Sequence, residues 1–115
     1  MPEPRLILTA HVQAGDYAAA LEAAKSVVAR VQSFARIREC RVRPYPKFDE
    51  RFSVWMQLEA DDPATTFDNL ASDLATQWDE GGDGADRFRI WDIRNHTAAA
   101  LPGLRWMHLN LFVSD

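Results

Sequence analysis

The sequence predicts a single α+β domain that spans residues 1–115. Short segments alternate apolar with polar side chains, which is the pattern of strands that bury one face. Two longer segments repeat apolar residues at the 3.6-residue spacing of amphipathic helices. The length suits one domain with its own hydrophobic core, and 47% apolar with 26% charged residues is ordinary for a globular protein.

The first strand is predicted at residues 5–12, because a short aliphatic run lies there between Pro4 and Gly15. Both faces of this run carry apolar side chains, which favours a central position in the sheet. A helix follows over residues 17–31, with Asp16 as the residue that caps its first turn. Its core-facing residues are Tyr17, Ala20, Leu21, Ala24, Val27, Val28 and Val31.

Two more strands are predicted at residues 37–45 and 52–60, with a turn between them. The second of these alternates most regularly, so that every other side chain from Phe52 to Ala60 faces the core. The opposite faces of the two strands carry Arg41, Arg43, Tyr45, Trp55, Gln57 and Glu59.

The second helix is predicted to begin at Pro63, because an acidic cap followed by proline is a strong helix start. Its apolar stripe extends to Trp78. The next residues, 79–86 with the sequence DEGGDGAD, are predicted to form a glycine-rich acidic loop, the most mobile part of the chain. A fourth strand is predicted at residues 88–94 and, after a connector, a fifth strand at residues 105–113.

The order strand, helix, strand, strand, helix, strand matches the split βαβ, or ferredoxin-like, βαββαβ motif, to which the fifth strand is an additional C-terminal element. Both crossovers are expected to be right-handed, which places both helices on one face of an antiparallel sheet. The other face is then left without a cover. The sequence leaves open whether the fifth strand extends the sheet or exchanges with a second chain.

Acidic residues are concentrated in residues 52–86, which contain nine carboxylates and neither lysine nor arginine. Asp61 and Asp62 are explained as helix-start residues. The others are expected to create a negative potential that speeds encounter with a basic partner, the alternative being a solvated surface that aids solubility. The acidic residues assigned to partner binding are Asp68, Asp73, Asp79, Glu80, Asp83 and Asp86.

The uncovered sheet face is expected to gather aromatic and arginine side chains, which are enriched at the centres of protein interfaces. His11 belongs to this face, and the fifth strand adds Trp106 and His108 if it extends the sheet. The alternative is that the fifth strand or the connector folds over part of the face. We predict a protein partner here, with a homodimer as one form of that contact. The residues assigned to it are Arg41, Tyr45, Trp55 and Trp91.

Composition disfavours several other classes of function. The pI near 5.3 argues against general nucleic-acid binding, which requires a basic surface, and the acidic helix argues against RNA stacking on the sheet. No segment approaches the roughly 20 apolar residues of a membrane span and no leader is apparent, so we expect a cytoplasmic protein. The single cysteine, Cys40, excludes an internal disulfide and an all-cysteine metal site.

The spacing of polar residues indicates no metal, cofactor or specific catalytic site. The three histidines lack the helix-face spacing of metal ligands, and a calcium-binding loop after Asp79 lacks its closing glutamate. Cys40 falls on the core face of its strand, where a thiol behaves as a small hydrophobe. A pair of His11 with Glu59 across neighbouring strands is geometrically allowed as an acid–base couple. We therefore expect no cofactor and favour binding over catalysis.

The acidic helix and loop, residues 61–80 (DDPATTFDNLASDLATQWDE) and 79–86, belong to a small acidic domain with an aromatic sheet face. In this it resembles the immunity proteins that bacteria make beside secreted polymorphic toxins of the contact-dependent inhibition type. The resemblance is one of type over the whole chain. It implies a non-catalytic inhibitor that forms a tight complex with a basic toxin domain, often a nuclease.

A second resemblance rests on residues 11–31 (HVQAGDYAAALEAAKSVVARV) and 52–60 (FSVWMQLEA). Their layout is similar to the dimeric α+β barrel group, which includes small monooxygenases and pairs its subunits through their open sheet faces. This implies a homodimeric enzyme or small-ligand binder as the alternative function. A stand-alone regulatory ligand-binding domain is a third interpretation.

Overall fold

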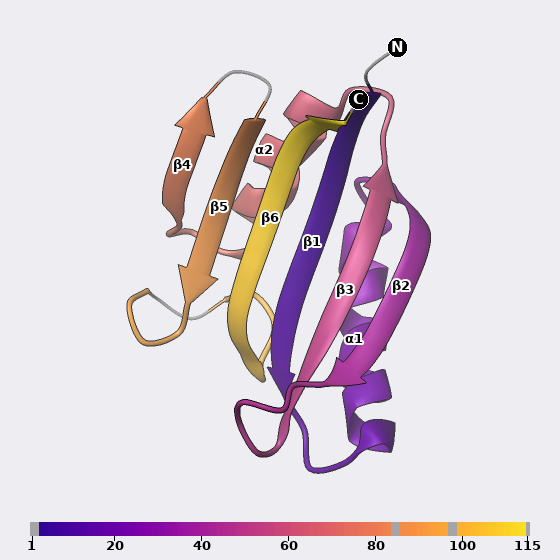
Figure 1. The fold of residues 1–115 in the computed structure, drawn as a ribbon, viewed down its shortest axis with the longest axis vertical. Helices are drawn as coiled ribbons and strands as arrows, with labels where there is room; N and C mark the ends of the chain where they lie inside the picture. The colour runs from indigo at the N-terminus through magenta and orange to yellow at the C-terminus, as the bar shows by residue number, and fades with distance from the viewer. Residues whose placement is uncertain (1–2, 84–85, 97–98, 115) are drawn as a thin grey trace.

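The computed structural model describes residues 3–83, 86–96 and 99–114, and it confirms the predicted α+β class. In these residues one antiparallel sheet of six strands, in the order β2-β3-β1-β6-β5-β4, packs two helices against one face (Figure 1). No helix among them is long and apolar enough to cross a membrane. The elements are β1 (Glu3–Gln13), α1 (Tyr17–Val31), β2 (Arg36–Pro44), β3 (Arg51–Glu59), α2 (Pro63–Leu74), β4 (Asp79–Asp83), β5 (Asp86–Asp92) and β6 (Leu104–Ser114).

Strand β1 lies at the centre of the sheet, between β3 and β6, as its aliphatic sequence predicts. Leu8 pairs with Met56 of β3 on one side and with Leu109 of β6 on the other, and all three side chains are fully buried. Side chains that lie directly opposite one another point to the same face, so this row forms the floor on which the helices pack. The hydrophobic core therefore lies between the sheet and the two helices.

Both helices begin where their capping residues predict. The carboxylate of Asp16 accepts a hydrogen bond from the backbone N–H of Ala19 (2.8 Å), and Asp62 accepts one from Thr65 (3.2 Å). Helix α2 ends at Leu74, before the predicted Trp78, whose indole Nε1 instead donates to carbonyl groups of the last helical turn. Residues buried by the helices are Ala20, Ala24, Val27, Val31, Phe67, Leu70, Ala71 and Leu74.

The prediction of a loop over residues 79–86 is wrong for Asp79–Asp83, which form β4 at the edge of the sheet, and for Asp86, the first residue of β5. This strand pairs with β5 and places Gly81 opposite Phe88. A Cβ atom at Gly81 would collide with the Phe88 ring, and Gly82 adopts a positive φ of 76° before the turn. The glycines that indicated a loop are thus the residues that a tight hairpin requires, while residues 84–85 of the predicted loop lie outside the described part.

On the side of β1 away from β3 lies β6, the last strand in the chain, and β5 lies one position further out (Figure 1). The prediction that residues 88–94 form the fourth strand of the motif and that the last strand is added to it is therefore wrong in strand order. Strand β6 pairs with β1 from Glu3 opposite Ser114 to Val12 opposite Leu104. The question that the sequence leaves open is therefore answered: the last strand extends the sheet of its own chain. The β4–β5 hairpin then widens the sheet on the far side of β6.

Candidate functional site

The uncovered sheet face is the side of the sheet that points away from both helices (Figure 1). Strand register places Thr9 opposite both Trp55 and His108, which defines a row that continues to Arg41 of β2 and Ile90 of β5. Its aromatic and aliphatic members are mostly half-buried by their neighbours within the sheet. The face includes Ile7, Thr9, His11, Arg41, Arg43, Ser53, Trp55, Gln57, Phe88, Ile90, Trp106, His108, Asn110 and Phe112.

Three residues assigned to this face by the sequence do lie on it. The guanidinium of Arg41 lies 5.2 Å from the centre of the Trp55 ring and forms an ion pair with Glu39 (2.8 Å). Tyr45, just beyond the end of β2, packs its ring 4.3 Å from the ring of His11. These contacts hold the aromatic and cationic side chains in place without covering them.

The predicted position of Trp91 on this face is wrong. Trp91 pairs with Met107 on the helix-covered side of the sheet, where both side chains are fully buried. Alternation along β5 shows which residues share a face but not which face the helices cover. Phe88 and Ile90 form the more apolar of the two faces of this strand, yet theirs is the uncovered one. On the covered side Arg87 and Arg89 accompany Trp91, and their charges are accommodated by Phe67 and an acidic neighbour in α2.

The pairing of His11 with Glu59 that the sequence allows does not form. His11 lies opposite Ser53, whereas Glu59 lies at the far end of β3 opposite Arg36 of the neighbouring strand. Its carboxylate forms ion pairs with Arg36 (3.4 Å) and Arg38 (3.5 Å). The acid–base couple considered from the sequence is therefore absent from this face.

The acidic flank is defined as Asp68, Asp73, Asp79, Glu80, Asp83 and Asp86. Three of these six residues form an ion pair with an arginine elsewhere in the described chain. Asp73 pairs with Arg30 of α1 (2.8 Å), while Asp68 and Glu80 pair with Arg89 of β5 (2.9 and 2.7 Å). Asp86 accepts a hydrogen bond from the backbone N–H of Val113. These contacts reduce the net negative potential that the local sequence predicts.

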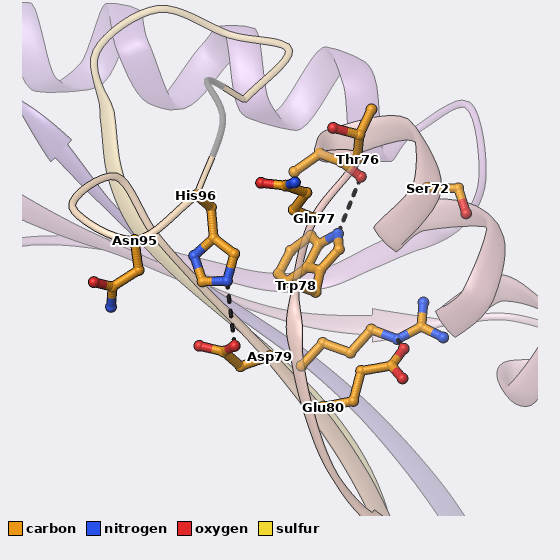
Figure 2. A pocket seen from close by; sticks show the side chains of 10 residues that line it. Ser72, Thr76, Gln77, Trp78, Asp79, Glu80, Asn95 and His96 are labelled. Carbon is orange, nitrogen blue, oxygen red and sulfur yellow. Dashed lines mark hydrogen bonds and ion pairs between the residues drawn. The ribbon is translucent and has the colours of Figure 1, made fainter.

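A pocket of about 830 Å³ lies between the end of α2, strand β4 and the segment after β5 (Figure 2). Nε2 of His96 lies 3.3 Å from the Asp79 carboxylate, and Glu80 reaches the Arg89 guanidinium on the other wall. Trp78 donates its indole N–H to the carbonyl of Ala75. Because these polar groups bind one another, the pocket is a junction that attaches β4 to the domain.

A second pocket, called here the His11 pocket, lies at the end of the uncovered face where β1, β2 and β5 finish and β3 and β6 begin. Its volume is about 540 Å³. The imidazole of His11, 9% exposed, lies between the rings of Tyr45 (4.3 Å) and Trp106 (4.7 Å). The pocket is lined by Thr9, His11, Tyr45, Lys47, Phe48, Arg51, Asp92, Ile93, Arg94, Arg105 and Trp106.

The titration of the groups in this pocket follows from burial and from the neighbouring cations. Burial, and then the charge of Arg51, lower the pKa of His11 below its ordinary value of 6.5. The hydrogen bond from Arg94 outweighs burial and keeps the pKa of Asp92 below its usual range. At neutral pH the pocket therefore holds an uncharged imidazole and an ionised carboxylate that is already engaged by arginine.

The sequence does not single out the cations of this pocket. Lys47 and Arg51 flank the β2–β3 turn, while Arg94 and Arg105 lie on either side of the β5–β6 connection. The sequence shows only that these cations lie near the ends of predicted strands. Which strand ends lie side by side depends on the order of the strands in the sheet. The assignment therefore needed the tertiary structure.

Metal and thiol chemistry find little support here. Among the described residues no group of three or more His, Cys, Asp or Glu side chains is placed to hold a metal ion. Cys40 is exposed on the edge strand β2, and partial burial raises the pKa of its thiol, which disfavours a reactive thiolate.

The geometry therefore leaves two features that are not explained by internal pairing, the uncovered sheet face and the His11 pocket at its end. Both consist of side chains rather than of a recognisable catalytic motif. Comparison with known protein families, curated proteins and solved structures finds no match to this chain.

Proposed function

We propose that this protein is a non-catalytic binding protein that inhibits a protein partner, as immunity proteins do, and that the uncovered sheet face makes the contact. The observation that carries the proposal is a broad face on which aromatic and aliphatic side chains such as Trp55, Ile7 and Ile90 are interspersed with polar and arginine side chains, and which no other layer of the described chain covers. Large exposed apolar patches mark interaction sites, and aromatic residues with arginine supply most of the binding energy there.

The proposal includes a ferredoxin-like description of the fold. Strands β1, β2, β3 and β6 with helices α1 and α2 have the order βαββαβ along the chain, and the sheet order β2-β3-β1-β6 fits that unit. The β4–β5 hairpin is then an insertion between α2 and the fourth strand. It enlarges the uncovered face by Phe88 and Ile90.

The charges on this face refine the expected contact. Arg5, Arg43 and Arg51 form no ion pair with the described acidic residues, whereas Asp68, Asp73 and Glu80 of the acidic flank are paired with arginines of this chain. We infer that a toxin with a basic surface is attracted by the net charge of −4. The part of the toxin that docks on the sheet is then an apolar patch bordered by acidic groups, which match the arginines of the sheet face. The sheet face thus supplies the affinity, and the acidic flank contributes to the rate of encounter.

A second candidate function uses the same face. In the dimeric α+β barrel group the open faces of two subunits enclose a ligand site, and the His11 pocket lies on the face that would be enclosed. This candidate predicts a stable homodimer in the absence of any other protein. The mass of the protein in solution separates it from the inhibitor function.

The test combines the protein with purified nuclease toxin domains that have a basic surface, and measures affinity by calorimetry and rescue of growth on co-expression. Trp55→Ala is expected to weaken the complex by about tenfold or more, because a half-buried aromatic residue at an interface centre is a typical hot spot. Tyr17→Ala removes an exposed aromatic ring from the helical layer and is expected to change affinity by less than about threefold. Equal losses in both variants, or no binding by the unchanged protein, would contradict the proposal.

A further inference from the structure

The His11 pocket concentrates positive charge in a protein whose net charge is −4. Lys47, Arg51, Arg94 and Arg105 line it, against the single carboxylate of Asp92. Arg94 engages that carboxylate through its Nη2 atom at 2.7 Å. Lys47, Arg51 and Arg105 form no ion pair with a described carboxylate, although the charge of Arg51 also acts on Asp92.

Packing, rather than ion pairing, positions these cations. The guanidinium of Arg51 lies 4.4 Å from the centre of the Phe48 ring, and the Lys47 ammonium lies 5.8 Å from the same ring. Phe48 in turn stacks on Tyr45 at 5.9 Å with an interplanar angle of 19°. Nη2 of Arg105 donates to the Gln13 side-chain carbonyl, a neutral partner that leaves its charge uncompensated.

The uncharged residues that line the pocket are suited to an aromatic ring of a ligand. Trp106 and Tyr45 border the pocket on either side of His11, and Thr9 adds a hydroxyl group to its floor. The pocket volume of about 540 Å³ falls within the range of small-ligand sites, roughly 300–1,000 Å³. The cations converge on one hollow instead of forming a stripe along the surface, which favours a small ligand over a nucleic acid.

We propose that the His11 pocket binds a small organic oxyanion, a carboxylate or phosphate attached to an aromatic ring. Arg51, Arg105 and Lys47 supply the charge that recognises the oxygen atoms, since guanidinium groups match carboxylate and phosphate geometry. Trp106 and Tyr45 border the ring. This site is formed by residues of one chain and needs no partner for its formation, although Thr9, His11 and Trp106 also belong to the face proposed to contact the partner.

The experiment titrates the full chain with phenyl phosphate and with benzoate at constant ionic strength, and follows amide and histidine ring signals by NMR. Inorganic phosphate is the probe without a ring. Arg51→Gln removes a half-buried cation of the pocket. Lys47→Gln removes an exposed cation of the pocket, so this substitution should leave the fold intact. Arg5→Gln is the matched control, an arginine that forms no ion pair with the described residues and lies on the same face at the far end of β1.

We expect at least one of the two aromatic probes to bind with signals shifted at Thr9, His11 and Trp106, and more tightly than inorganic phosphate. Arg51→Gln and Lys47→Gln are each expected to weaken binding by roughly three- to tenfold, and Arg5→Gln by less than twofold. A bound anion offsets the charge of Arg51, so the pKa of His11 should rise on binding.

Three results would overturn the inference. The first is that neither aromatic probe binds at concentrations up to about 10 mM, because a specific site of this kind has a lower dissociation constant. The second is an equal loss in Arg5→Gln and Arg51→Gln, which would indicate non-specific attraction. The third is inorganic phosphate binding as tightly as phenyl phosphate, which would show that the rings take no part. The preferred probe identifies the oxyanion as carboxylate or phosphate.

Discussion

The imidazole of His11 lies between two aromatic rings, 4.3 Å from Tyr45, and is almost excluded from water although it belongs to the uncovered sheet face. The neighbouring charge that acts on it is the cation of Arg51 from β3. Both burial and that cation disfavour the imidazolium form. A residue that looks like an exposed histidine in the sequence is thus kept neutral by its tertiary environment.

The first prediction concerns the pH dependence of stability. The pKa of His11 is lower in the folded protein than its ordinary value of 6.5, so the unfolded chain binds a proton first as the pH falls. Stability is therefore expected to fall with decreasing pH from about 6.5 downward until the folded-state pKa is reached. The midpoint of urea unfolding, measured between about pH 7.5 and 5.5, checks this.

His108 adds to this effect, because burial lowers its pKa as well. His11→Phe is expected to reduce the slope of stability against pH in that range, and the double change of His11 and His108 to reduce it further. A slope that is unchanged in His11→Phe would contradict the assignment.

The second prediction concerns Trp91, which fills the core between β5 and the helices. Trp91→Ala is expected to lower the free energy of unfolding by about 3–5 kcal/mol, the cost of a large cavity in a packed core. Trp55→Ala removes a ring of the same size from the uncovered face and is expected to cost about 1 kcal/mol. Urea unfolding of the two variants gives the comparison, and similar losses would argue against the face assignments.

The third prediction concerns the hairpin of β4 and β5. A Cβ atom at Gly82 would collide with the backbone carbonyl of Asp86, and φ at this residue is 76°. Gly82→Ala is therefore expected to cost about 1–3 kcal/mol and to lower amide-exchange protection in β4 and β5. Gly15→Ala is the control, because a Cβ atom there meets no neighbouring atom. Equal protection in both variants would indicate that the hairpin turn is not strained by the substitution.

The fourth prediction concerns the acidic flank. Asp73 forms a half-buried ion pair with Arg30, so Asp73→Asn is expected to lower stability by about 0.3–1 kcal/mol, and less at high salt. Asp83→Asn removes an equal charge from an exposed residue and is expected to leave stability within about 0.5 kcal/mol of the unchanged protein. Thermal unfolding at low and high salt measures both. A larger loss in Asp83→Asn would show that the flank is not neutralised as described.

The fifth prediction concerns the mass in solution. As an inhibitor whose sheet face awaits another protein, the chain alone is expected to be a monomer at both low and high salt. Size-exclusion chromatography with light scattering measures this directly. If the chain is a dimer and Trp55→Arg converts it to a monomer, the homodimeric candidate function is favoured instead. The substitution places a charge at the centre of the uncovered face and would therefore disrupt a dimer formed through that face.

The sequence by itself determined the features that depend on neighbours in the chain. Asp16 and Asp62 cap helices because a carboxylate reaches backbone N–H groups three residues away, and that distance is set by local geometry. The regular alternation of β3 likewise assigns Met56 to the core and Trp55 to the opposite face. These contacts require no knowledge of where other elements lie.

Only the tertiary structure decided the features that depend on pairing between distant strands. Trp91 faces the helices because β5 pairs with β6 in a register that puts it opposite Met107, and a shift of one residue would turn every side chain to the other face. The same strand order brings Arg89 to the acidic flank, and Arg51 and Arg105 to His11. Alternation specifies relative faces within a strand, whereas the free energy of packing between strands selects which face is buried.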